Sequence, residues 1–183
     1  MATSPRPRLG ISACLLGQPV RYDGGHKRDA ICVDLLGPQF EWVPVCPEVE
    51  VGMPVPRPPI RLTGRSEAPA LVADGTGEDW TKRMAAFAAG RVEQLERLGL
   101  DGHVTKKDSP SCGLAGVLIH PSTGGPPGRD GVGAFVAVLR SRLPLLPIEE
   151  EGRLLDPILR QRFVERIFAH ARGRRRAPPA TGG

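Results

Sequence analysis

Residues 106–113 read KKDSPSCG and gather two ammonium groups, two hydroxyls and a thiol in one short loop. Apolar runs precede and follow the loop, which indicates that it connects two regular elements. A loop that only joined two strands would not need these groups, because reactive side chains on loops usually serve function. Cys14 and Cys46 have the same setting, each at the end of an apolar extended segment. We therefore predict that Cys14, Cys46 and Cys112 meet in space.

The bulk composition is that of an ordinary globular domain. The chain has 183 residues, of which 40% are hydrophobic and 25% charged, and this length is enough for one domain with a real core. The sequence contains no run of about 18 apolar residues, so it predicts no membrane span. Residues 1–8 are basic but lack the apolar stretch of a signal peptide, so we expect a cytoplasmic protein that does not contact membranes. Four cysteines without an export signal argue against a disulfide framework.

The positive charge is concentrated near one end of the chain. Four arginines at residues 172–176 account for most of the formal net charge of +5, so the rest is nearly neutral. We expect residues 172–183 to be a basic, disordered, solvated tail. The alternative is an arm that binds RNA through its phosphates.

The hydrophobic pattern predicts an α/β fold: a Rossmann-like, mostly parallel sheet flanked by helices, in a single domain. The expected strands are residues 9–16, 40–45, 102–105 and 143–148, with a short one at 117–119 and short antiparallel pieces at 60–73. The expected helices are residues 28–36, 79–98, 132–141 and 153–170, the last anchored by Ile158, Phe163, Ile167 and Phe168. The expected irregular segments are residues 46–59 and 121–131. By region, we expect a lead-in at 1–8, the α/β domain at 9–148, a C-terminal helix at 149–171 and the tail.

Ligands of such sheets bind beyond the carboxyl ends of the strands, and three of the four cysteines lie at or just past such an end. The fourth, Cys32, lies on the apolar stripe of its predicted helix, so we interpret it as a buried structural thiol. No Cys-x-x-Cys pair occurs, which disfavours zinc ribbons and thioredoxin-like chemistry. Three thiols leave two possibilities open. One is a zinc site with an open position, and the other is an iron–sulfur cluster with one iron that lacks a protein ligand.

Several blocks of sequence together resemble the thiouracil desulfidase family over about residues 9–148. The blocks are SACLLG at 12–17, RYDG at 21–24, CPEV at 46–49, PVPRP at 54–58, and Lys106 followed by SPSCG at 109–113. The resemblance implies a [4Fe-4S] cluster held by Cys14, Cys46 and Cys112. It also implies a desulfidase that removes sulfur from thiolated pyrimidines by non-redox, hydrolytic C–S cleavage.

The same resemblance implies roles for two residues beside the ligands. Glu48 would deprotonate the attacking water, and Ser109 would position that water or pass a proton to the ring nitrogen. Without the family, Glu48 is equally well interpreted as a solvated carboxylate or a partner of Arg57, and Ser109 and Ser111 as turn caps. The candidates for holding the substrate are Ser12, Asp23, Arg57, Lys106 and Ser111, with Arg21 and Lys107 as further cations.

Two other functions compete with the desulfidase. One is a hydrolase that uses the three cysteines to bind zinc, and the other is a small RNA-binding module that uses the basic tail. The expected partner of the enzyme is a thiolated pyrimidine base or nucleotide, with RNA bound through the tail as an option. Residues 149–168 resemble the junction before a second domain in longer relatives linked to thiouridine in transfer RNA. We expect a monomer or a homodimer.

Overall fold

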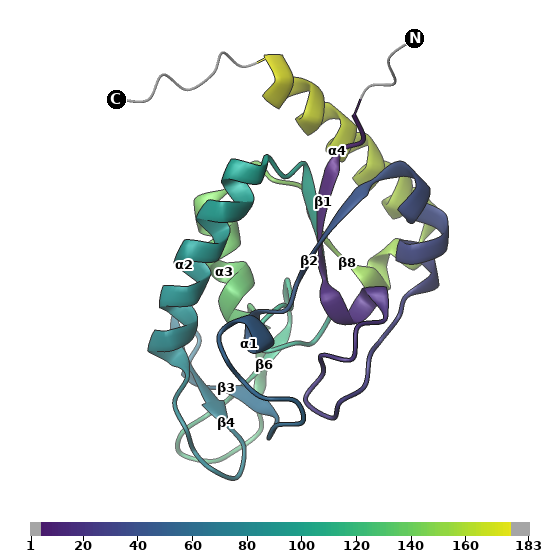
Figure 1. Cartoon of the computed structure of the whole chain (residues 1–183). Helices are drawn as coiled ribbons and strands as arrows, with labels where there is room; N and C mark the ends of the chain where they lie inside the picture. Colours follow the sequence, from purple (N-terminus) through teal and green to yellow (C-terminus); the bar gives the residue numbers. More distant parts are fainter. Residues whose placement is uncertain (1–4, 177–183) are drawn as a thin grey trace.

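The computed structural model describes residues 5–176, which form two four-stranded sheets with helices packed around them (Figure 1). All neighbouring strands of the first sheet, sheet A, run parallel. In spatial order, its strands are β2 (Glu41–Val45), β1 (Arg8–Ser12), β5 (Gly102–Thr105) and β8 (Ile148–Glu150). Because the strands are parallel, their carboxyl ends share one edge of the sheet.

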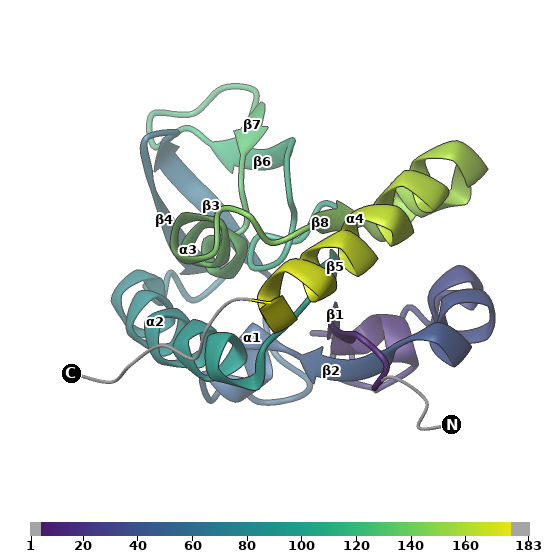
Figure 2. The same ribbon diagram turned by 90° about the horizontal axis from the view of Figure 1, so that it is seen from above.

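The second sheet, sheet B, is mixed and lies to one side of sheet A (Figure 2). In spatial order, its strands are β4 (Ala68–Ala73), β3 (Ile60–Arg65), β6 (Val117–His120) and β7 (Gly128–Gly131). The β3–β4 hairpin is the antiparallel pair predicted at residues 60–73. Strand β7 lies in the segment expected to be irregular; its glycine-rich sequence gives no strand pattern of its own, and it forms by antiparallel pairing with the preceding strand β6.

Helices cover both faces of sheet A, as the predicted α/β fold requires. On one face, α2 (Thr81–Leu98) and α3 (Ala134–Arg142) pack through a cluster that includes Val45, Leu95 and Phe135. On the other, α4 (Pro157–Arg176) and the short π-helical turn η2 (Ile31–Leu36) pack on β1 (Figure 1). Helix α2 begins where the Asp79 carboxylate accepts the amide proton of Thr81, and Gly99 ends it at φ 69°.

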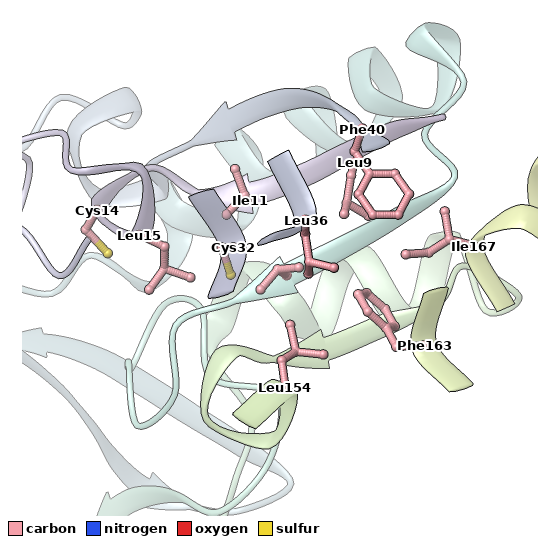
Figure 3. Packing of buried hydrophobic residues seen from close by; sticks show 11 residues of the cluster. Leu9, Ile11, Cys14, Leu15, Cys32, Leu36, Phe40, Leu154, Phe163 and Ile167 are labelled. Carbon is pink, nitrogen blue, oxygen red and sulfur yellow. The ribbon is translucent and has the colours of Figure 1, made fainter. Parts of the chain in front are cut away.

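Cys32 lies in the apolar cluster formed by β1, η2 and α4, and it is buried there as predicted. Its side chain is fully buried, on η2, among residues of β1, η2 and α4 that include Ile11, Leu36 and Phe163 (Figure 3). Cys14 belongs to the same cluster. Cys32 is therefore a packing residue. Cys14 packs in the same cluster but also lines the candidate site at the edge of sheet A.

Several predicted boundaries at the sheet edge are wrong. The strand expected at 9–16 ends at Ser12, because Ala13–Leu16 forms a 3₁₀ turn, η1, closed by Gly17 at φ 89°. The strand expected at 143–148 is β8, which begins only at Ile148. The helix expected from residue 28 begins at Ile31. A four-residue helix, α1 (Pro47–Glu50), also occupies part of the segment predicted to be irregular.

The C-terminal helix also differs from its prediction. A 3₁₀ turn, η4 (Glu151–Leu155), precedes α4, and the proposed anchor Ile158 is exposed, while Phe163 and Ile167 are fully buried. Helix α4 continues through Arg176, into the segment expected to be disordered. The rest of that tail, residues 177–183, and residues 1–4 of the lead-in lie outside the described residues. Within residues 5–176, no helix is both long and apolar enough to cross a membrane.

Candidate functional site

The three predicted thiols line one cavity of about 330 Å³ at the carboxyl edge of sheet A. Cys14 lies in η1 directly after β1, Cys46 directly follows β2, and Cys112 lies in the loop after β5. Because β2, β1 and β5 are adjacent and parallel, residues just past their ends are neighbours in space. The sheet thus brings together three cysteines that lie far apart in the chain.

Burial sets the protonation of these thiols. Burial, together with the nearby Cys46, raises the pKa of Cys14 to about 11. Burial also raises the pKa values of Cys46 and Cys112 above their ordinary value. The thiols therefore stay protonated at neutral pH unless a positively charged group binds them, and such binding releases protons.

The loop that carries Cys112 is fixed by its own serine and by the start of α3. The Ser109 hydroxyl oxygen accepts the amide protons of Ser111 and Cys112, at 3.3 and 3.1 Å. This is the turn-capping role considered for Ser109, and it leaves the hydroxyl proton available. The first amides of α3 donate to the carbonyls of Pro110 and Ser111, at 2.9 and 3.0 Å.

Gly133, at the start of α3, was not identified from the sequence. A Cβ atom at this position would lie 2.5 Å from the Ser111 carbonyl carbon and 2.6 Å from the Cys112 amide nitrogen. The close approach of these two backbones requires glycine. The only sequence signal was a glycine in the first turn of the helix predicted at residues 132–141, which is too common to identify such a contact.

Glu48 lies on α1, two residues after Cys46, and its carboxylate is held by two side chains. Arg57 donates to Oε2 from Nη2 at 2.6 Å and from Nε at 3.0 Å, and Ser111 donates to Oε1 at 3.0 Å. Arg57 also donates to the carbonyls of Val20 and Pro54. The ion pair that we considered for Glu48 is therefore present, and it is partly buried at the cavity wall.

The structure distributes the candidate substrate residues unevenly. Ser12, Arg57 and Lys106 line the cavity, whereas Ser111 is fully buried behind Glu48. Asp23 is not brought into the cavity; its carboxylate accepts the Gly25 amide proton at 2.9 Å, and this bond lowers the pKa of Asp23. The two further candidate cations, Arg21 and Lys107, also line the cavity, and Tyr22, Pro59 and Ile60 are among the residues that add aromatic and apolar surface.

Among the described residues, no group of three or more His, Cys, Asp or Glu side chains is arranged to hold a single metal ion. The arginines expected to form an RNA-binding arm belong to α4 up to Arg176. Arg174 is paired with the buried Asp101 at 3.0 Å, and Arg175 donates to the Pro5 carbonyl.

The chain belongs to the 2-thiouracil desulfurase family, whose model matches residues 9–151. This match confirms the predicted family. Among solved structures, the chain is similar to the [4Fe-4S]-dependent thiouracil desulfidase TudS, with 31% sequence identity and a TM-score of 0.69 over 87% of this chain and 99% of that one. It is also similar to YbbK, an uncharacterized protein of Bacillus subtilis (strain 168), with 29% identity over 108 residues, 56% of this chain and 71% of YbbK. The likeness to TudS confirms the predicted α/β fold.

Proposed function

We propose that this chain is an iron–sulfur-dependent desulfidase that removes sulfur from thiolated pyrimidines of the 2-thiouracil or 4-thiouracil type by hydrolysis. The observation that carries the proposal is the arrangement at the edge of sheet A, where two buried thiols, the half-buried Cys46 thiol and a doubly held carboxylate line one cavity. Membership of the 2-thiouracil desulfurase family and the likeness to TudS support the same substrate class.

The residues at this edge fit a [4Fe-4S] cluster with three protein ligands, Cys14, Cys46 and Cys112. All three thiols line a cavity of about 330 Å³, which has room for a group of several atoms. The remaining cysteine, Cys32, is fully enclosed in the core and does not line the cavity. When bound, a cluster of this kind supplies an iron with an open position, a Lewis acid that polarises a thiocarbonyl group.

Glu48 is the general base of the proposed reaction. Its contacts with Arg57 and Ser111 fix the position of the carboxylate at the cavity wall, where it would accept a proton from water. Such a base contributes about 10²–10⁴-fold to a rate. The oxygen of that water forms a bond with the thiocarbonyl carbon, the C–S bond breaks, and sulfur leaves as hydrosulfide. The oxo pyrimidine remains, and no electron is gained or lost overall.

Ser109 is the second proposed catalytic group. Because its oxygen already accepts two amide protons, its own proton is free to point into the cavity, where Ser109 is part of the lining. It is placed to orient the water or to protonate a ring nitrogen. Ser12, Arg57 and Lys106, which line the same cavity, and Ser111, through its bond to Glu48, complete the surroundings proposed for the substrate.

The test is anaerobic reconstitution with iron and sulfide, followed by incubation with 2-thiouracil, 4-thiouracil and their nucleotides. We expect a brown protein that releases hydrosulfide and the oxo base in equal amounts. Replacing Cys14, Cys46 or Cys112 with alanine should abolish both iron binding and turnover, whereas Cys32→Ala should keep both. A colourless zinc protein, or an iron-loaded protein that leaves every thiopyrimidine unchanged, would contradict the proposal.

A further inference from the structure

Three consecutive glutamates, Glu149–Glu151, are each less than 10% exposed, which is unusual for carboxylates. Burying a charged group is costly unless it is paired and hydrogen-bonded, so their contacts indicate what they stabilise. They lie at the end of β8, which pairs in parallel with β5. Strand β5 leads directly into residues 106–114, which we call the Cys112 loop.

Two of the three carboxylates hold the two ends of the Cys112 loop. Glu151 accepts hydrogen bonds from the Lys106 ammonium group and, at 2.7 Å, from the Lys107 amide. Glu150 accepts the amide proton of Leu114 at 3.0 Å. One carboxylate thus binds the loop where it leaves β5, and the other binds it two residues after Cys112.

Glu149 has the same burial but different partners. Its carboxylate accepts a hydrogen bond from Arg153 at 2.8 Å and lies 3.8 Å from the Arg166 guanidinium. It also accepts the amide proton of Glu150. None of these contacts joins Glu149 to the Cys112 loop, so Glu149 provides a matched comparison within the same strand end.

We propose that Glu150 and Glu151 are positioning residues that clamp the Cys112 loop and so hold the Cys112 thiol and the Lys106 ammonium group in place for the cluster site. The inference rests on the proposed function, in which Cys112 is a ligand. Neither glutamate lines the cavity, so both act through the loop and not on the substrate. The clamp complements the first amides of α3, which hold the middle of the loop through the carbonyls of Pro110 and Ser111.

The variant Glu151→Gln tests the clamp with almost no change in shape. The carboxylate presents an acceptor to each of its two donors, whereas glutamine has one acceptor oxygen and turns an NH₂ group toward the second donor. Either the Lys106 or the Lys107 contact is therefore lost. Glu149→Gln removes the same charge from the same strand end and leaves the loop contacts intact, and Glu150→Gln should be milder than Glu151→Gln because one acceptor is enough for Leu114.

The first measurement is the rate at which an iron chelator strips the reconstituted protein under anaerobic conditions. Loss of one charge-assisted contact predicts about tenfold faster iron loss for Glu151→Gln than for Glu149→Gln. The electron paramagnetic resonance spectrum of the reduced cluster should broaden in Glu151→Gln alone. Equal stripping rates for these two variants would overturn the positioning role.

The second measurement is amide hydrogen exchange of the cluster-free protein, which does not depend on iron or on activity. We expect the Cys112 loop to exchange about tenfold faster in Glu151→Gln, with β1 and α2 unchanged, and to match the wild type in Glu149→Gln. Unchanged exchange in Glu151→Gln would overturn the clamp even if the wild type binds iron. If the wild type takes up no iron, the proposed function fails, and the exchange data still decide whether the clamp orders the loop.

Discussion

At the scale of single residues, the site depends on a few polar side chains that satisfy one another away from bulk water. Arg57 makes four hydrogen bonds, two to Glu48 and two to backbone carbonyls, and it is 8% exposed. An arginine that is so fully engaged orients the carboxylate better than it could bind a substrate of variable shape. We therefore expect the function of Glu48 to depend on Arg57 as well as on its place beside Cys46.

Replacing Glu48 with glutamine should lower kcat by about 10²–10⁴-fold, because the amide cannot accept the proton of the attacking water. Iron content and the visible spectrum should stay at the wild-type level, since Glu48 is not a proposed ligand. Steady-state turnover of 2-thiouracil by the reconstituted variant measures the effect. Full turnover with an intact cluster would show that another group is the base.

His103 gives a prediction for stability against pH. It lies on β5, it is fully buried, and burial lowers its pKa from 6.5 to about 4. Below pH 6.5 the unfolded chain takes up a proton that folded His103 does not, so stability should fall as the pH drops from 6.5 to 4. The shift corresponds to about 3 kcal/mol of unfolding free energy. Urea denaturation of the cluster-free protein at both pH values should show this loss, and His103→Leu should lack that part of it.

At the scale of elements, α3 shapes the site through its backbone. Its first amides donate to the loop that carries Cys112, and Gly133 allows the two backbones to touch. Helix α2, in contrast, packs on sheet A through an apolar cluster and contacts α1 through a side-chain ion pair between Arg91 and Glu50. The two helices should therefore respond differently to the same glycine-to-alanine change.

Gly133→Ala should destabilise the protein by about 1–3 kcal/mol, because the new methyl group meets backbone atoms that cannot move aside. It should also lower iron uptake, since the atoms it meets belong to Ser111 and Cys112. Gly90→Ala, on an exposed turn of α2 with nothing within 4 Å, should stabilise the protein by about 0.5–1 kcal/mol. Denaturation curves and iron content measure both effects, and equal behaviour of the two variants would contradict the assigned contact.

The elements also show what the sequence could predict and what it could not. Helix α2 was predicted closely, because a long apolar stripe is bounded by Asp79 and Gly99. The end of β1 was missed, because the apolar residues of η1 look like a continued strand. Sheet B could not be predicted as a separate sheet, since its central pair, β3 with β6, joins segments far apart in the chain.

At the scale of the whole molecule, α4 connects the start and end of the described chain. Asp101, just before β5, is fully buried and accepts hydrogen bonds from Arg174 and from the Arg8 amide, at 3.0 and 3.1 Å. The contact docks the last turns of α4 beside β1 and explains why the arginines at 172–176 are part of a helix. The sequence showed the arginines but not Asp101 as their partner. In the same way, it showed Cys112 but not the glutamates that hold the Cys112 loop.

Asp101→Asn should lower the free energy of unfolding by roughly 1–3 kcal/mol, because Arg174 loses a charge-assisted pair with a buried group. The exchange rates of backbone amides should rise in the last turns of α4 and stay unchanged in the Cys112 loop. Glu93→Gln, which breaks an exposed pair with Arg97 on α2, should cost less than about 0.5 kcal/mol. Urea denaturation compares the two, and a cost as small as that of Glu93→Gln would rule out a stabilising role for the Asp101 contact.

The spatial order of sheet A also bears on how the protein is made. The strand that ends at Glu150 pairs with β5, and its glutamates hold the loop of the third proposed ligand. During synthesis, the first two proposed ligands, Cys14 and Cys46, leave the ribosome long before that strand does. A cofactor delivered to the nascent chain would find an unfinished pocket, so its insertion belongs after folding, as the last step of maturation.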